Sequence, residues 1–191
     1  MGLGEISLVT RRSRLRPEYP ISQLSQIAVC CRLSRTKQSI DMVLIASWTP
    51  LSLTTVATQT LTRSSHALIA HAGKAYIFGG ELKARIPVDG ALHMLDLSSG
   101  QHSSIQIADS TEAPAPRVGT ALAKVGDAFY LWGGRGGKEM KPLSGELWKF
   151  ELGRKESKWE KLATKGEQPE ERSYHVLTGV QPVNVFTILL F

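Results

Sequence analysis

Histidines and a glycine-rich segment are the parts of this chain that could support chemistry. The five histidines are dispersed, and none forms the His-x-x-x-His pair that places two metal-binding imidazoles on one helical face. His66 and His175 each stand three residues after an arginine, at the same position of a repeat described below. A repeated position indicates a repeated structural role, so we expect packing and hydrogen bonding there.

The glycine-rich segment is a poor phosphate loop. Residues 133–138 read Gly-Gly-Arg-Gly-Gly-Lys, without the Walker spacing and without a following Ser or Thr. The segment also stands between two expected strands, whereas a phosphate-binding loop leads into a helix. No Gly-x-Ser-x-Gly nucleophile motif is present. The sequence therefore favours a protein without catalytic activity.

The chain contains an internal repeat with a period near fifty. Two apolar segments end on Gly-Gly pairs 54 residues apart, at Gly79-Gly80 and Gly133-Gly134 (133 − 79 = 54). Three arginines keep nearly the same step (117 − 63 = 54; 172 − 117 = 55), and they are Arg63, Arg117 and Arg172. Such a period is typical of stacked supersecondary units that bury their apolar faces against one another.

Each copy of the repeat predicts four short antiparallel strands. A half-apolar run and a run ending on Gly-Gly form a hairpin, because the turn between them holds a glycine, Gly73 or Gly126. Two more strands follow a variable loop. The expected strands of the first copy are 67–70, 76–78, 91–97 and 103–107, and those of the second are 120–125, 129–132, 146–152 and 159–162. Four such strands make one propeller blade.

These marks resemble the kelch family of β-propellers over Trp48 to His175. They are the Gly-Gly pairs, the aromatic-bearing third strand and Trp159 in the fourth, where the first copy has His102. The resemblance implies an all-β fold: a partial kelch β-propeller with two complete four-stranded antiparallel blades and incomplete flanking blades. We expect the Gly-Gly pairs to allow a bend and a close approach of neighbouring backbone.

The predicted domain comprises residues 42–191. Its blades are expected at about 63–107 and 117–162, with a third begun at Arg172 and Trp48 to Leu51 as the fourth strand of a preceding blade. The third Gly-Gly should fall near residue 188, where no glycine occurs. Propellers close with about four to eight blades. The sequence therefore suggests a fragment of a longer propeller, or a divergent or mis-predicted gene product.

Residues 1–41 form a basic segment that carries most of the net charge. They hold seven Arg or Lys and three acidic residues, which is +4 of the formal +6. Three interpretations stay open: a disordered or mis-annotated extension before Met42, a mitochondrial transit peptide, and a tail that binds phosphates. No aromatic platform accompanies the charge, so no nucleic-acid partner is expected.

Targeting and redox features are few. Cys30 and Cys31 are the only cysteines, and adjacent cysteines provide neither a disulfide framework nor a zinc site. No secretory signal and no apolar run of about 18 residues is present, so we expect no membrane partner. A cytoplasmic protein is the default expectation, with the mitochondrion as the alternative.

The kelch resemblance implies that the loops entering the first strand and those after Gly-Gly gather at the faces of the ring. The candidates for binding a protein partner, an acidic peptide or a small anion are Arg63, Arg117, Arg135, Arg172 and Glu81. Alternatively, the blade-opening arginines staple the fold by pairing with carboxylates or carbonyls of neighbouring blades. Self-association through unpaired blades is a further expectation. We expect a non-catalytic interaction or scaffold module.

The first blade also resembles a blade of the nitrile-specifier and thiocyanate-forming kelch proteins, which depend on Fe2+. Their iron motif is Glu-x3-Asp-x3-His before a third strand, and this chain has Asp89 and His93 at that spacing, with Arg85 in place of the Glu. The resemblance implies an alternative function as an Fe(II)-dependent protein acting on a small sulfur-containing metabolite, or a truncated inactive fragment of one.

Overall fold

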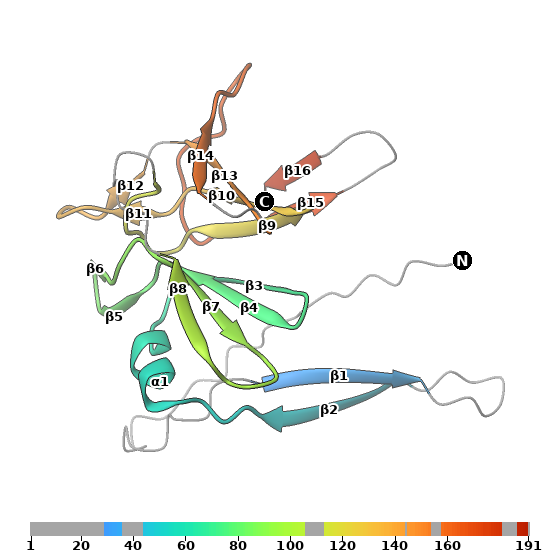
Figure 1. Cartoon of the computed structure of the whole chain (residues 1–191). Helices are drawn as coiled ribbons and strands as arrows, with labels where there is room; N and C mark the ends of the chain where they lie inside the picture. The colour runs from blue at the N-terminus through green and yellow to red at the C-terminus, as the bar shows by residue number, and fades with distance from the viewer. Residues whose placement is uncertain are drawn as a thin grey trace.

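A computed structural model of the 191-residue chain describes residues 29–35, 44–105, 113–143, 145–153, 158–180 and 187–190. The side chains are described from residue 50 to residue 180, with the same internal gaps. The described part consists of antiparallel strands and one short helix (Figure 1). This confirms the all-β prediction. The basic segment 1–41 falls mostly outside the described residues, and so does the loop 106–112.

Two four-stranded antiparallel sheets form the centre of the molecule. The first has the order β3-β4-β7-β8 and the second has the order β9-β10-β13-β14 in the same pattern. Each strand therefore pairs with the next one of its blade, as the repeat predicted. The bounds are β3 Ala67–His71, β4 Lys74–Phe78, β7 Leu92–Asp96, β8 His102–Ile105, β9 Ala121–Val125, β10 Ala128–Trp132, β13 Leu147–Glu151 and β14 Trp159–Leu162.

A short hairpin follows the Gly-Gly pair in each sheet, where the sequence predicted only a variable loop. These hairpins are β5 Glu81–Lys83 with β6 Ile86–Pro87, and β11 Arg135–Gly136 with β12 Lys141–Pro142. Isolated backbone bridges join them to the residue after each blade-opening arginine, Ser64 to Glu81 and Val118 to Arg135. Both hairpins project from the same side of the two sheets (Figure 1).

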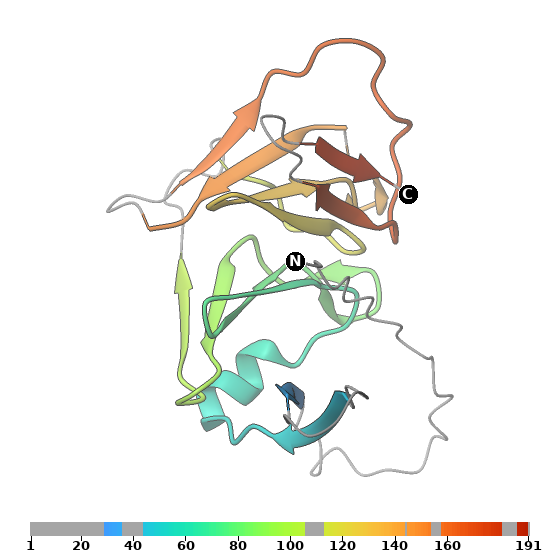
Figure 2. The same ribbon diagram turned by 90° about the vertical axis from the view of Figure 1, so that its right-hand side faces the viewer.

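A two-stranded sheet flanks the pair of blades on each side. One consists of β1 Val29–Arg35 and β2 Leu44–Pro50, and the other consists of β15 Leu177–Val180 and β16 Thr187–Leu190. The first lies beyond β7 and β8, whereas β15 lies beside β9 (Figures 1 and 2). These pairs are incomplete blades that flank the complete ones, as the sequence predicted. The strand β1, however, lies within the segment 1–41 that the sequence analysis placed outside the domain.

The prediction that a third Gly-Gly pair falls near residue 188 is wrong, because the connection between the two strands of the third blade is longer. β15 pairs Leu177 with Leu190, as β9 pairs Leu122 with Leu131 in the preceding sheet. Six residues, 181–186, separate β15 from β16, whereas two residues separate β9 from β10. The longer connection moves the position equivalent to Gly133 past Phe191.

The helix α1, Thr55–Leu61, was not predicted. It begins at the N-cap residue Thr54, whose side-chain oxygen accepts a hydrogen bond from the Ala57 N–H at 3.2 Å. Ala57 is fully buried, whereas Val56 is exposed. The helix contains three β-branched threonines and a single buried residue, so the sequence provides no strong helical pattern.

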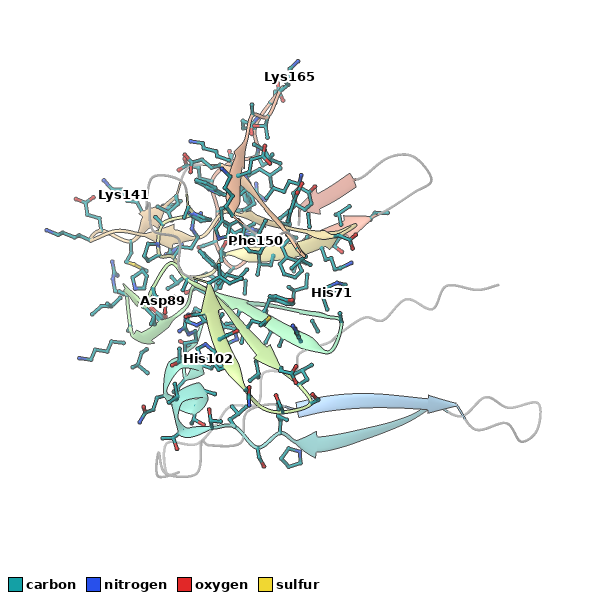
Figure 3. All side chains as sticks on the ribbon, viewed as in Figure 1. His71, Asp89, His102, Lys141, Phe150 and Lys165 are labelled. Carbon is teal, nitrogen blue, oxygen red and sulfur yellow. The ribbon has the colours of Figure 1, made fainter. Side chains whose placement is uncertain are left out.

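The core lies between the two four-stranded sheets. Tyr76 meets Phe129 edge to face at a centroid distance of 4.7 Å, and Phe78 meets Trp159 in the same way at 5.5 Å. Each such pair contributes about 0.5–1.5 kcal/mol beyond simple burial. Phe150 also packs between the sheets, as Figure 3 shows. The buried cluster also includes Ala67, Leu92, Leu122, Leu131 and Trp148.

A second, smaller cluster joins the second sheet to β15. It contains Ala121, Ala123, Trp132 and Leu177. The His175 ring packs edge to face on Trp132 at 5.0 Å, in line with the packing role that the repeat predicted for this histidine. The flanking strand β15 thus uses the same kind of apolar interface as the complete blades.

The Gly-Gly pairs allow the close approach that the sequence predicted. Gly79 and Gly133 have φ values of +69° and +67°. A Cβ on Gly79 would lie 2.4 Å from the Arg117 carbonyl oxygen, and one on Gly133 would lie 2.7 Å from that of Arg172. The N–H of the following glycine donates to the same carbonyl at 2.9 Å in both places. Each pair therefore joins one blade to the next.

Candidate functional site

Arg63 and Arg117 bind backbone within their own blades. The Arg63 Nη1 donates to the Gly79 carbonyl at 3.0 Å, and the Arg117 Nη1 donates to the Gly133 carbonyl at 3.1 Å. The Arg63 side chain is 1% exposed, and Arg117 is 2% exposed. Burial lowers the pKa of Arg117 to about 10, which leaves it charged at neutral pH. Both contacts lie within one blade, whereas the stapling alternative expected partners in neighbouring blades.

Arg172 differs from the two other blade-opening arginines. Its side chain is exposed, and its Nε donates to the Glu170 carbonyl at 3.1 Å. The carbonyl that would correspond to Gly79 or Gly133 lies past residue 191, because β16 ends at Leu190. Among the blade-opening arginines, Arg172 alone presents its guanidinium on the described surface.

Arg135 lies at the start of the second projecting hairpin and reaches the third blade. Its Nε donates to the Ser173 Oγ at 2.9 Å. Its guanidinium carbon lies 5.8 Å from the centroid of the Tyr174 ring, within the range of a cation–π interaction. Tyr174 is 63% exposed, so both groups remain accessible.

Glu81 belongs to the same surface as Arg135. The Ser65 Oγ donates to the Glu81 Oε1 at 3.3 Å, and the Tyr174 hydroxyl donates to the Ser65 Oγ at 3.4 Å. We call Glu81, Ser65, Tyr174 and Arg135 the polar row. The row crosses three blades and has a carboxylate at one end and a guanidinium at the other.

The backbone beneath the polar row adopts an uncommon conformation. Ser65, Gly119 and Tyr174 occupy one repeat position and have φ values of +58°, +63° and +60°. The Gly119 N–H donates to the Ser65 carbonyl at 2.8 Å, and the Tyr174 N–H donates to the Gly119 carbonyl at 2.7 Å. A non-glycine residue in this region costs of the order of 1–2 kcal/mol, so packing between blades must impose it.

Sequence reasoning missed Ser65 and Tyr174 as surface residues. The available signal was their alignment with Gly119 at the same step of the repeat, because a glycine there indicates a left-handed position. Ser65 and Tyr174 stand at a repeat position whose backbone conformation favours glycine, and aligning the repeats shows this conflict between residue type and conformation.

Apolar side chains border the polar row on the hairpin β5–β6. Leu82 is 65% exposed and Ile86 is 57% exposed. The surface thus combines one aromatic ring, two opposite charges and a rim of aliphatic groups, which is the composition of many protein-binding patches.

Asp89 and His93 come together as their spacing predicted. The His93 Nε2 lies 3.0 Å from the Asp89 Oδ1, and the Arg63 Nη2 lies 3.0 Å from the Asp89 Oδ2. Burial alone would raise the pKa of Asp89, but hydrogen bonds from His93 and Arg63 outweigh it and lower the pKa to about 2. Asp89 is therefore a paired carboxylate within the first blade.

His102 extends this cluster to the fourth strand. Its Nε2 lies 3.0 Å from the His93 Nδ1, and the two rings are stacked with centroids 5.2 Å apart. Figure 3 shows Asp89 and His102 on the same side of the first sheet, whereas His71 lies at the opposite end of the blade. In the second blade, Trp148 and Trp159 occupy the places of His93 and His102, so a polar cluster replaces an aromatic one.

The residues at Asp89 do not fit an Fe2+ centre. The Arg63 Nη2 lies 3.2 Å from the His93 Nε2, so a guanidinium occupies the space in front of the two expected ligands. A cation there would meet a fixed positive charge. Within the described ranges, no group of three or more His, Cys, Asp or Glu side chains is arranged to hold a metal ion.

The two complete sheets, their glycine contacts and their flanking half-sheets define a segment of a kelch-type β-propeller. A family profile described as the KLHDC2/KLHL20/DRC7 Kelch-repeats domain matches residues 34–188. The chain therefore belongs to the kelch-repeat family. The solved structure of YjhT has the same fold, with a TM-score of 0.51, 17% identity, and coverage of 74% of this chain and 48% of that one.

Three curated relatives are similar over parts of their length. A leucine-zipper-like transcriptional regulator 1 homolog of Drosophila melanogaster is 38% identical over 38% of this chain and 7% of its own. An N-(sulfonatooxy)prop-2-enimidothioate sulfolyase of Thlaspi arvense is 33% identical over 61% of this chain and 32% of its own length. The serine/threonine-protein phosphatase BSL2 of Arabidopsis thaliana is 30% identical over 69% of this chain and 12% of its own length. The chain thus spans about a third or less of these relatives.

In the part of the chain that the structure describes, no helix is long and apolar enough to cross a bilayer.

Proposed function

We propose that this chain is a protein-interaction module that holds a partner at the polar row and catalyses no reaction. The observation that carries the proposal is the exposed Tyr174, which Arg135 and Ser65 contact from two other blades. Rigid aromatic and guanidinium groups are the side chains that most often dominate binding energy at protein interfaces. Here they are held on a scaffold rather than on a free loop.

The charges of the polar row indicate what the partner presents. Arg135 offers a planar donor fork to a carboxylate, and Glu81 at the other end accepts hydrogen bonds from a basic or amide group. A peptide segment with an acidic residue, an apolar residue for Leu82 and Ile86, and a donor would match all three parts. The opposite charges disfavour a simple anion as the ligand.

Affinity capture followed by measurement of binding tests this proposal. The partner recovered with the unaltered chain is identified, purified and titrated against Arg135→Ala and Tyr174→Ala. Each change is expected to weaken binding at least about tenfold, equal to 1.4 kcal/mol. Lys165→Ala is the matched control, because this exposed lysine lies far from the polar row (Figure 3). A partner that binds Arg135→Ala and Tyr174→Ala as tightly as the control Lys165→Ala contradicts the proposal.

The similarity to the Thlaspi arvense sulfolyase gives an iron-dependent activity less support. It covers a third of that enzyme, and the Asp89 carboxylate is already paired with Arg63 and His93. Measurement of iron bound per chain decides this alternative. Stoichiometric Fe2+ that Asp89→Ala abolishes would favour it over the interaction module.

A further inference from the structure

The two flanking half-sheets are complementary parts of one blade. In the complete blades, the second strand pairs with the third. The first strands of successive blades, β3, β9 and β15, lie next to one another. β15 and β16 correspond to β9 and β10, because Leu177 and Leu190 pair as Leu122 and Leu131 do. This half-sheet therefore supplies strands one and two of a blade, and no described residue pairs with the outer edge of β16.

β1 and β2 correspond to strands three and four of a blade. Trp48 in β2 precedes Arg63 by 15 residues (63 − 48), and His102 in β8 precedes Arg117 by the same number (117 − 102). β2 is thus a fourth strand, and β1, which pairs with it antiparallel, is a third strand. In a complete blade the free edge of β1 would pair with a second strand such as β16.

In the described residues of one copy, the two half-sheets do not pair with each other. These residues form two complete blades and two halves of a blade, whereas propellers close with about four to eight blades. In both views the half-sheets lie on opposite sides of the complete blades (Figures 1 and 2). Two copies would supply six blades.

The exposed faces on the two sides are also complementary. On the first blade, Leu68 is 56% exposed, whereas its counterpart Leu122 is buried against the preceding blade. Around Leu68 is a groove of about 470 Å³ beside α1, lined also by Ile77, Leu95 and Leu97. On the far side, β15 and the residue before it expose Val180 and Val176, at the places of the buried Val125 and Ala121.

The central backbone hydrogen bonds continue this pattern. Gly119 and Tyr174 each donate an N–H to the residue one repeat earlier. Within the described residues, the Ser65 N–H and the Tyr174 carbonyl make no such bond. They are a donor on the first blade and an acceptor on the third, so one copy can satisfy the other.

We propose that two copies of this chain close one six-bladed ring, in which β16 of each copy pairs with β1 of the other and the Val176–Val180 face of each packs on the Leu68 face of the other. The free edges of two-stranded sheets are ready templates for such pairing. Both contacts are head to tail, and a two-fold axis makes them equivalent, so the assembly closes instead of polymerising.

Light scattering on the purified 191-residue chain tests the ring. The expected mass is twice the 20.9 kDa of one chain. Leu68→Glu and Val180→Glu each place a charge in a contact and are expected to raise the dimer dissociation constant at least about tenfold, since an unpaired charge is costly to bury. Ile86→Glu, also at an exposed aliphatic residue, should leave the dimer unchanged. Circular dichroism verifies that each variant keeps its strands.

A mixture of the Leu68→Glu and Val180→Glu chains distinguishes this ring from other assemblies. Leu68→Glu and Val180→Glu chains together retain one unaltered contact, so they should associate more tightly than either alone. A face-to-face dimer would be lost with Leu68→Glu and retained with Val180→Glu, which overturns the proposal. A monomer of the unaltered chain, or species that grow beyond two copies, overturns it as well.

Discussion

The carbonyl oxygen of Arg117 lies 2.4 Å from the point where Gly79 would carry a Cβ. The same carbonyl accepts the N–H of Gly80 at 2.9 Å. One backbone group thus connects two blades, and it can do so only because the first residue of the Gly-Gly pair has no side chain. The contact between Gly133 and Arg172 repeats this arrangement one blade later.

Gly79→Ala should therefore destabilise the protein more than a glycine substitution in open space. Gly73→Ala is the matched control, since Gly73 has a φ of +74° and no atom within 4 Å of its Cβ position. The control should cost about 1–2 kcal/mol for its left-handed backbone, and Gly79→Ala at least about 2 kcal/mol more, because backbone must move. Urea unfolding measures both, and equal losses would contradict the interblade role.

Phe129→Ala should remove about 3–5 kcal/mol of stability, because the ring is fully buried between the sheets and meets Tyr76. The neighbouring Tyr130 points to the other face of the strand and is only partly buried, so Tyr130→Ala should cost clearly less. Thermal or urea unfolding compares the two. Equal costs would show that the core does not lie between these sheets.

Asp89 should contribute a pH-dependent part of the stability. Its pKa in the folded protein is about 2, below the unfolded value of 3.8. A lowered carboxyl pKa stabilises the folded state above the unfolded pKa, and this contribution is lost as the pH falls from about 4 to about 2. The expected size is about 1–2 kcal/mol, allowing for partial exposure. Unfolding free energies of Asp89→Asn and the unaltered chain should converge over that window. A difference that stays constant from pH 5 to pH 2 would contradict the pairing.

Tyr174→Gly should separate backbone strain from recognition. Glycine adopts the φ of +60° without the cost borne by tyrosine, so the variant should unfold within about 1 kcal/mol of the unaltered chain. It also removes the ring against Arg135, so partner binding should fall at least about tenfold. Unfolding and titration on one preparation check both. Retained binding would show that the aromatic ring is dispensable.

The order of strands was predictable because it rests on local patterns. The Gly-Gly pairs at Gly79 and Gly133 and the spacing of Arg63, Arg117 and Arg172 define the blades. Apolar runs separated by glycine turns define their strands. The helix α1 was not predictable, because its sequence has no amphipathic pattern and Ala57 is its only buried residue. The length of the connection 181–186 also moved the third blade out of the predicted register.

The candidate site was predictable only in part. Residue types and spacing pointed to Arg135, Glu81, Asp89 and His93, since charge and repeat position can be read along the chain. Which of these share a surface depends on distances between blades. The fold brings Glu81 and Arg135 together through Tyr174, and it buries Arg63 against Asp89. The sequence alone determined the repeating blade, because each blade is local in the chain. Only the tertiary structure decided which arginines are buried and which are presented, because burial is a property of neighbouring blades.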